Sequence, residues 1–300
     1  MQIQDAHTHF FSRPFFDGLA ALSPRASEPG LVDAVAAKAG LQLPDPDPAR
    51  HAARWVGEMD SKGVQRMVSF ASLPGEAEAV AAAARSAGGR LVPYTIVNPT
   101  DPKAPAFTER ALGTLGFRGL LTFPAMHQFR PGDACMQPVL ELARTHKAPV
   151  LVHCGLLKVK LRDAFGIPRP YDLTYADPLA VVVAANRFRD VSFVLPHFGG
   201  GMLEHALLAG AQCENICVDT SSSNDWMAAL PGSVALADVF RAALRVFGAE
   251  RILFGTDSST FPRGWRGDIR DAQLQALEQA GAKAAQVDAV MGGNLARLLP

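Results

Sequence analysis

The chain has 300 residues, of which 48% are hydrophobic, so it holds enough apolar material for one large core or for two smaller domains. Its 29 basic residues balance its 29 acidic ones, and no long basic stripe appears. A nucleic acid or an anionic membrane is therefore not expected as the main partner. No apolar run approaches the roughly 18 residues of a membrane span. The expected partner is a small-molecule substrate.

The cysteines indicate a reducing compartment. None of the four belongs to a C-x-x-C pair, and four in 300 residues are too few for a disulfide scaffold. We therefore expect buried, reduced thiols in a cytoplasmic protein. A secretory signal is not expected, because no basic and then apolar segment precedes His7 and His9.

Strand-like apolar runs alternate along the chain with segments of helical periodicity. The sequence predicts strands near residues 2–8, 64–71, 90–97, 116–123, 149–153, 191–196, 215–220 and 251–256. It predicts helices near residues 48–62, 74–88, 103–114, 135–147, 177–188, 201–212, 234–248 and 268–280. Regular alternation implies a parallel sheet, and eight repeats imply an α/β fold closed into a (β/α)8 TIM-type barrel. A doubly wound open sheet is the alternative, but it would want a glycine-rich loop after the first strand, which His9-Phe10-Phe11-Ser12 does not offer.

Three stretches interrupt the alternation, and each follows the carboxyl end of a predicted strand. Residues 10–47 carry four phenylalanines and several prolines, and we expect them to form an insertion that lines a pocket. Residues 154–176 and 258–267 carry basic and aromatic side chains. Barrels of this kind place their chemistry on the carboxyl-terminal face. Short helices in residues 283–300 are expected to close a single domain that spans residues 1–300.

Two histidines, His7 and His9, end the first predicted strand. Side chains two residues apart on a strand point to the same face, so both imidazoles can aim at a common point. Three later predicted strands close with His153, His197 and Asp257. Neutral imidazole is a common ligand of catalytic metals, and a buried carboxylate needs a cation or donors. We expect all of these residues except His197 to hold one divalent ion, most readily Zn²⁺, with Mn²⁺, Co²⁺ or Fe²⁺ as alternatives.

His197 is assigned a different role, because one group should remain for proton transfer. The glycines that follow it, in Phe198-Gly199-Gly200-Gly201, allow the backbone to approach a ligand closely. A histidine beside a metal can act as a general acid or base near neutral pH. Service as a further ligand is the alternative for His197, and Asp257 is the second candidate for a catalytic group.

The substrate contacts are expected in the loops that follow the strands. Guanidinium groups pair bidentately with carboxylates, and aromatic rings supply flat apolar walls. The candidates are Arg13, His127, Arg263 and Trp265.

These motifs together resemble the amidohydrolase superfamily over nearly the whole chain. The resemblance is carried by Asp5-x-His7-x-His9, His153, His197-Phe198-Gly199-Gly200, Gly255-Thr256-Asp257 and Gly293-Asn294-Leu295-Ala296-Arg297-Leu298. Within the superfamily, the chain is most similar to the amidohydrolase-related branch that includes aminocarboxymuconate-semialdehyde decarboxylase. The resemblance implies a distorted barrel with a divalent metal at His7, His9, His153 and Asp257, and a catalytic histidine at His197.

One departure from the superfamily pattern bears on the number of metals. Members with two metals usually have a bridging carboxylated lysine or a glutamate at the end of the fourth strand. Here that stretch reads Gly119-Leu120-Leu121-Thr122-Phe123-Pro124 and has neither. A mononuclear site follows.

The branch contains hydrolases of lactones and related esters as well as non-oxidative decarboxylases of unsaturated or aromatic acids, so two reactions stay open. The first hypothesis is a metal-dependent hydrolase that acts on a small carboxylate-bearing substrate through a metal-activated water. The alternative is a carbon–carbon lyase. A barrel that has lost catalysis and only binds a small molecule is a third hypothesis, but the intact set of metal-binding residues argues against it. A metal-independent hydrolase is a fourth. The oligomeric state stays open, with a homodimer as one outcome.

Overall fold

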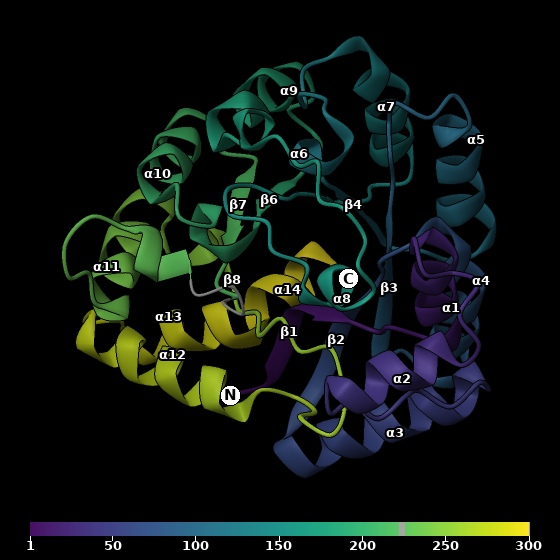
Figure 1. The fold of residues 1–300 in the computed structure, drawn as a ribbon. Helices are drawn as coiled ribbons and strands as arrows, with labels where there is room; N and C mark the ends of the chain where they lie inside the picture. Colours follow the sequence, from purple (N-terminus) through teal and green to yellow (C-terminus); the bar gives the residue numbers. More distant parts are fainter. Residues whose placement is uncertain (222–225, 300) are drawn as a thin grey trace.

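The computed structural model describes residues 1–221 and 226–299, and its strands form one eight-stranded sheet in the order β1 to β8 (Figure 1). Each neighbouring pair, from β1 with β2 to β7 with β8, runs parallel. The strands are β1 (Ile3–His9), β2 (Val64–Ala71), β3 (Leu91–Ile96), β4 (Gly119–Thr122), β5 (Val150–Val152), β6 (Phe193–Leu195), β7 (Ile216–Asp219) and β8 (Ile252–Leu253).

Backbone hydrogen bonds between β1 and the chain that follows β8 close the sheet into a barrel. The amide of Ala6 donates to the carbonyl of Phe254 at 2.8 Å, and the amide of Asp257 donates to the carbonyl of His7 at 2.8 Å. Parallel order with the first strand beside the last is the arrangement of a (β/α)8 barrel. The predicted barrel is thus confirmed, and the open doubly wound sheet is excluded.

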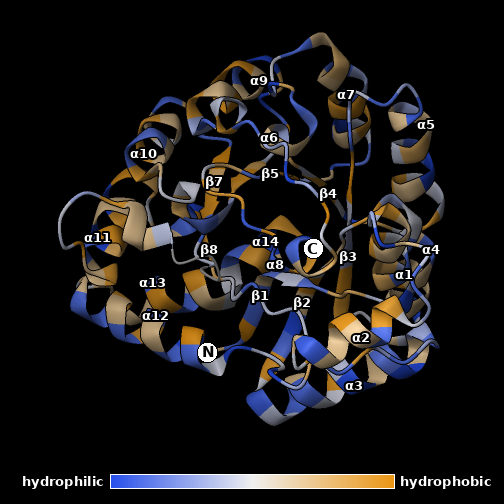
Figure 2. Cartoon of the chain, viewed as in Figure 1, coloured by the Kyte–Doolittle hydropathy of each residue, from blue (hydrophilic) through white to orange (hydrophobic). Residues whose placement is uncertain are grey.

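Helices form a ring around the strands, as Figure 1 shows. They are α1 (Arg13–Leu22), α2 (Leu31–Lys38), α3 (Pro48–Lys62), α4 (Ala77–Ser86), α5 (Ala104–Glu109), α6 (Pro124–His127), α7 (Gln137–Thr145), α8 (Lys160–Ala164), α9 (Val181–Arg187), α10 (Leu203–Gln212), α11 (Leu236–Phe247), α12 (Gly267–Gln279), α13 (Ala284–Asp288) and α14 (Asn294–Leu298). In Figure 2 these helices carry hydrophilic stretches interrupted by hydrophobic ones, as amphipathic helices do. Among the described residues, no helix combines the length and the apolar character needed to cross a membrane.

Alternating strand residues build two separate hydrophobic layers. Side chains inside the barrel form one cluster that includes Val68, Phe70, Tyr94, Leu121 and Leu151. Side chains on the other face of the strands pack against the helices, and this larger cluster includes Trp55, Met67, Leu120, Val150 and Phe240. Residues that alternate between the interior and the helix layer are the expected pattern for a barrel strand.

The insertion after β1 folds into α1 and α2 and packs on two other loops. Phe11, Phe15 and Phe16 share a hydrophobic cluster with Phe165, which follows α8. The hydroxyl of Ser23 donates to the carbonyl of Phe165 at 2.5 Å. Burying a phenylalanine contributes roughly 1.5–3 kcal/mol, so this cluster fixes the insertion against the segment that follows β5. The insertion is folded, and its pocket-lining role stays a prediction.

The last helices close the amino-terminal end of the barrel. Leu295 and Leu299 belong to the interior cluster, and the guanidinium of Arg66 donates to the carbonyl of Leu299 at 2.9 Å. Figure 1 accordingly shows the C-terminus in the middle of the ring. The predicted short helices at the end of the chain are present, although position 300 lies outside the described residues. The carboxyl ends of the strands, where barrels of this kind place their chemistry, lie at the opposite end.

Candidate metal centre

A β-bulge in β1 changes which of its side chains point into the barrel. Asp5 pairs with Met67, but Thr8 pairs with Ser69, so β1 uses one more residue than β2 over this stretch. A bulge of this kind re-aims side chains and is common beside active sites. Ala6 belongs to the interior cluster, and His7 follows it toward the barrel axis.

Asp5 faces the helix layer rather than the metal centre. It is fully buried and accepts hydrogen bonds from the indole N–H of Trp265 at 2.7 Å and from the hydroxyl of Thr256 at 2.5 Å. It also accepts from the amide of His7 at 2.9 Å. Burial, opposed by the hydrogen bond from Thr256, raises the pKa of Asp5 to about 6. Asp5 therefore supports the backbone that carries His7 and ties β1 to the chain after β8.

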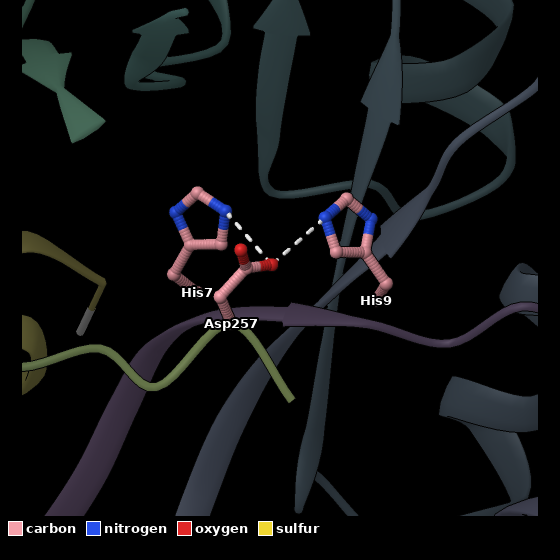
Figure 3. A group of neighbouring side chains, drawn as sticks. All are labelled: His7, His9 and Asp257. Atoms are coloured by element: carbon pink, nitrogen blue, oxygen red, sulfur yellow. Dashed lines mark ion pairs between the residues drawn. The ribbon is translucent and has the colours of Figure 1, made fainter. Parts of the chain in front are cut away.

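His7, His9 and Asp257 converge on one point, as Figure 3 shows. Asp257 Oδ1 lies 3.2 Å from His9 Nε2 and 3.8 Å from His7 Nε2. One potential ligand atom from each of the three residues lies within 4.8 Å of the others. Asp257 adopts a left-handed backbone (φ 58°), which turns its side chain back toward β1. Such strain in a residue other than glycine is typical of functional sites.

The charges of these residues reinforce one another. Burial acts to raise the pKa of Asp257, but the hydrogen bond from His9 and the charge of His7 outweigh it and lower the pKa. Burial acts to lower the pKa of His7, but Asp219 and Asp257 outweigh it and raise the pKa. The centre therefore favours positive charge between its imidazoles and its carboxylate.

His153 and His197 lie beside this group, at the ends of β5 and β6. The ring centroids of His197 and His7 are 4.7 Å apart, and those of His153 and His197 are 5.3 Å apart. Phe123 stacks on His153 at 5.0 Å, where β4 ends. Burial, reinforced by His197, lowers the pKa of His153 well below its ordinary value. The five residues that the sequence singled out at strand ends are thus neighbours in space.

Asp219, at the end of β7, supports two of these histidines at once. It is fully buried and accepts from His7 Nδ1 at 2.8 Å and from the amide of His197 at 3.1 Å. The amide of Ser221 donates to it at 3.0 Å, and the hydroxyl of Ser221 donates to it as well. Asp219 was not among the site residues expected from the sequence, although Ile216-Cys217-Val218-Asp219 is an apolar strand that ends in a carboxylate, the same signal that identified Asp257.

These contacts set the tautomers of His7 and His197. A carboxylate only accepts hydrogen bonds, so His7 Nδ1 carries the proton that points at Asp219, and Nε2 presents a lone pair when the ring is neutral. His197 Nδ1 lies 3.0 Å from the carbonyl of Ser221 and 2.9 Å from its hydroxyl, whose proton is given to Asp219. His197 Nδ1 is therefore also the donor, and its Nε2 is the free atom.

Support for His9 comes from the loop after β2. His9 Nδ1 lies 2.7 Å from the hydroxyl of Ser72, and the amide of Ser72 donates to Glu76 at 2.7 Å. Glu76 is fully buried and also accepts from the amide of Ser12 at 2.5 Å. Burial, opposed by the hydrogen bonds from Ser12 and Ser72, raises the pKa of Glu76 to about 7.

The residues present fit a divalent cation. If His7 is neutral, its Nε2 lone pair faces a carboxylate oxygen at 3.8 Å, an arrangement that a cation between the two atoms satisfies. His153 Nδ1 is buried and has no hydrogen-bond partner within the described part of the chain. Imidazole nitrogens and a carboxylate oxygen are the ligands of catalytic zinc and related ions. His153 lies outside the tight group of His7, His9 and Asp257, so its part in binding a metal stays a prediction.

The residues expected to contact a substrate are spread over four positions. Arg13 lies in the first turn of α1 and pairs with Asp17 at 3.1 Å. His127 ends α6 and is half-buried, and Arg263 donates to Ser259 in the loop after β8. Trp265 is buried, and its N–H is bonded to Asp5, so this ring packs in the helix layer behind β1.

Histidines and an aspartate gathered at the strand ends of a closed eight-stranded barrel form a group that could hold a metal ion, on the face where such barrels place their active sites. The family model of the amidohydrolases, Amidohydro_2, matches residues 4–300, so the chain belongs to that family. No curated protein sequence matches the chain.

Solved structures of similar fold cover nearly all of the chain. The 5-carboxyvanillate decarboxylase of Sphingomonas paucimobilis has a TM-score of 0.66 at 18% identity, and 99% of this chain aligns with 98% of that one. The 5-carboxyvanillate decarboxylase of Novosphingobium aromaticivorans, complexed with manganese and 4-hydroxy-3-methoxy-5-nitrobenzoic acid, has a TM-score of 0.65 at 14% identity, with coverages of 99% and 96%. A putative 2-pyrone-4,6-dicarboxylic acid hydrolase of Pseudomonas putida has a TM-score of 0.61 at 18% identity, with coverages of 99% and 97%. At these identities the likeness establishes the fold.

Proposed function

We propose that this protein is a metal-dependent enzyme that removes carbon dioxide, without oxidation, from a small aromatic or unsaturated carboxylic acid. The observation that carries the proposal is the group of His7, His9 and Asp257 beside His197, an imidazole whose Nδ1 is already bonded to Ser221. Two of the three similar structures named above are decarboxylases, which supports decarboxylation over the hydrolysis expected first from the sequence.

His7, His9, His153 and Asp257 would hold one divalent ion, because residues 119–124, at the end of β4, contain neither a lysine nor a glutamate that could bridge two metals. When bound, the ion would supply Lewis-acid polarisation of a substrate oxygen. Zn²⁺ remains a candidate, and the manganese in the Novosphingobium enzyme supports Mn²⁺ as another.

His197 Nε2 is the proposed site of proton transfer. Nε2, which bears a lone pair in the neutral ring, would first take up a proton from solvent. The carbon–carbon bond to the carboxyl group then breaks, carbon dioxide leaves, and this proton forms the new carbon–hydrogen bond. One proton from solvent is therefore consumed for each carbon dioxide released. Ser221 keeps Nδ1 occupied throughout, which leaves Nε2 as the single exchanging atom.

Hydrolysis of a lactone or related ester is the second candidate, supported by the similarity to the putative 2-pyrone-4,6-dicarboxylic acid hydrolase. The same Nε2 would then accept a proton from the attacking water. The two reactions differ in their products, because only decarboxylation releases carbon dioxide.

A panel of aromatic acids, unsaturated acids and lactones, followed by ultraviolet absorbance and carbon dioxide release, tests the proposal. Carbon dioxide release from an acid supports it, and turnover of lactones alone would replace it with the hydrolase. His197→Asn should keep the metal while turnover falls by ~10²–10⁴-fold. His153→Ala should instead lose metal, because one ligand is removed. Equal metal loss in the two variants would make His197 a ligand and would return proton transfer to Asp257.

A further inference from the structure

The segment that follows β5 folds back over α6 and places Tyr171 against this short helix, whose last residue is His127. The amide of Asp172 donates to the carbonyl of Ala125 at 3.0 Å, and the side chain of Gln128 donates to the carbonyl of Pro170 at 3.3 Å. Tyr171 lies between these two anchored neighbours. Its ring packs against the interior cluster of the barrel.

Arg162 lies on α8, just before the segment that carries Tyr171. The amide of Ile167 donates to the carbonyl of Arg162 at 2.9 Å, and Arg169 pairs with Asp163 at 2.8 Å, so the chain turns from α8 directly back toward residue 171. The positive charge of Arg162 acts on both His127 and Tyr171. Burial and then Arg162 lower the pKa of His127 to about 4, while Arg162 opposes the rise that burial causes in the pKa of Tyr171.

Each of these three side chains has a buried polar atom without a partner. The atoms are His127 Nδ1, Arg162 Nε and the hydroxyl of Tyr171, and none is hydrogen-bonded within the part of the chain that the structure describes. Buried polar atoms in folded proteins are nearly always paired. Three unpaired atoms on neighbouring elements indicate that their partner is a molecule from outside the chain.

The three residues adjoin the metal centre through the apolar interior of the barrel. Tyr171, Met126 and Leu157 pack in the cluster that contains Phe123. Phe123 in turn stacks on His153 at 5.0 Å. An aromatic substrate could therefore extend from His153 along apolar side chains to this second group of polar atoms.

We propose that His127, Arg162 and Tyr171 form a subsite for a second acidic group of the substrate, a carboxylate that the reaction does not remove. Arg162 and Tyr171 both offer hydrogen-bond donors, and a neutral His127 can offer a third. A guanidinium with neutral donors around it is a common carboxylate site. This inference rests on the proposed function and specifies it: the substrate is a dicarboxylic acid with an apolar, flat middle.

The test measures binding, so it does not depend on turnover. Isothermal titration calorimetry would compare isophthalate with its monoamide, which has the same shape and one carboxylate fewer. The wild type should prefer isophthalate. Arg162→Gln should weaken isophthalate binding by roughly 10–100-fold, the range for hydrogen bonds to charged groups, and leave the monoamide unchanged. Tyr171→Phe should act in the same direction with a smaller change.

Arg85→Gln is the matched control, because Arg85 is an exposed arginine on α4 that lies near Gly89 and Leu299 at the other end of the barrel. It should bind both probes as the wild type does. Equal preference in the wild type and Arg162→Gln, or no measurable binding of isophthalate, would overturn the inference and assign the three atoms to bound water. If the preference depends on Arg162 but no acid in the panel releases carbon dioxide, the proposed decarboxylation fails and the subsite stands.

Discussion

Replacing Asp219 by asparagine should weaken the binding of a divalent ion although Asp219 is not one of the proposed ligands. Its Oδ1 accepts from the amides of His197 and Ser221 and from the hydroxyl of Ser221, whereas Oδ2 accepts from His7 Nδ1. An asparagine keeps one oxygen, which the three donors on the Oδ1 side would take. Its NH2 group would then face His7 Nδ1, and His7 would have to move its proton to Nε2.

The expected magnitude follows from what such supporting contacts do in metal sites. Removing the partner that orients a ligating histidine typically costs 10–100-fold in metal affinity, so we expect Asp219→Asn to raise the Kd by roughly that factor. Competition with a chelator, for both Zn²⁺ and Mn²⁺, measures it. Asp177→Asn is the matched control, because Asp177 accepts from His205 Nδ1 at 2.9 Å in a partly exposed pair outside the metal centre.

Asp219→Asn should also change the tautomer of His7. The ¹⁵N signals of His7 in the metal-free protein should shift from a protonated Nδ1 to a protonated Nε2, while the unfolding transition stays cooperative. A folded Asp219→Asn variant with the Kd of the wild type would refute the reasoning, because His7 would then need no carboxylate to present its lone pair.

Three further predictions test other parts of the site. The pKa of Glu76 is raised from 4.5 to about 7, so the folded state holds a proton that the unfolded state releases, and stability should fall as pH rises between these values. Glu76→Gln should remove this dependence in denaturant titrations at several pH values, and a variant with the slope of the wild type would contradict the assignment. In Gly255→Ala the new Cβ would lie 2.9 Å from His7 Cβ, so we expect a loss of roughly 1–3 kcal/mol together with weaker metal binding. Gly57→Ala, in α3 with nothing within 4 Å, should instead be neutral or stabilising by roughly 0.5–1 kcal/mol, and equal effects of the two substitutions would argue against crowding. Elemental analysis should find one divalent ion per chain, and two ions or a modified lysine would refute the mononuclear site.

The strand ends were predictable because two independent patterns coincide there. Apolar runs mark the strands, and a histidine or aspartate at or near the end of several runs marks the shared rim of a parallel barrel. His7, His9, His153, His197 and Asp257 were found in this way, and the structure places them together.

What could not be predicted depends on backbone irregularity and on contacts between distant loops. Strict alternation places Asp5 on the same face as His7, but the bulge in β1 sends it to the helix layer. Trp265 is buried in the helix layer as well, because its indole N–H donates to the buried carboxylate of Asp5. The partnership of Arg162 with His127 and Tyr171 depends on how residues 155–176 fold back, which no local pattern encodes.

The position of the metal centre across the seam of the barrel has a consequence for how the protein matures. His7 and His9 leave the ribosome early, whereas Asp257 is synthesised near the end, and β1 finds its last neighbour only when β8 exists. An ion held by residues from both ends of the chain would close a long loop, and closing a long loop costs more conformational entropy than closing a short one. Binding of the proposed ion would therefore add a second link across the seam, beside the backbone hydrogen bonds that already join β1 to the chain after β8. A chain that ends before Asp257 would lack both links.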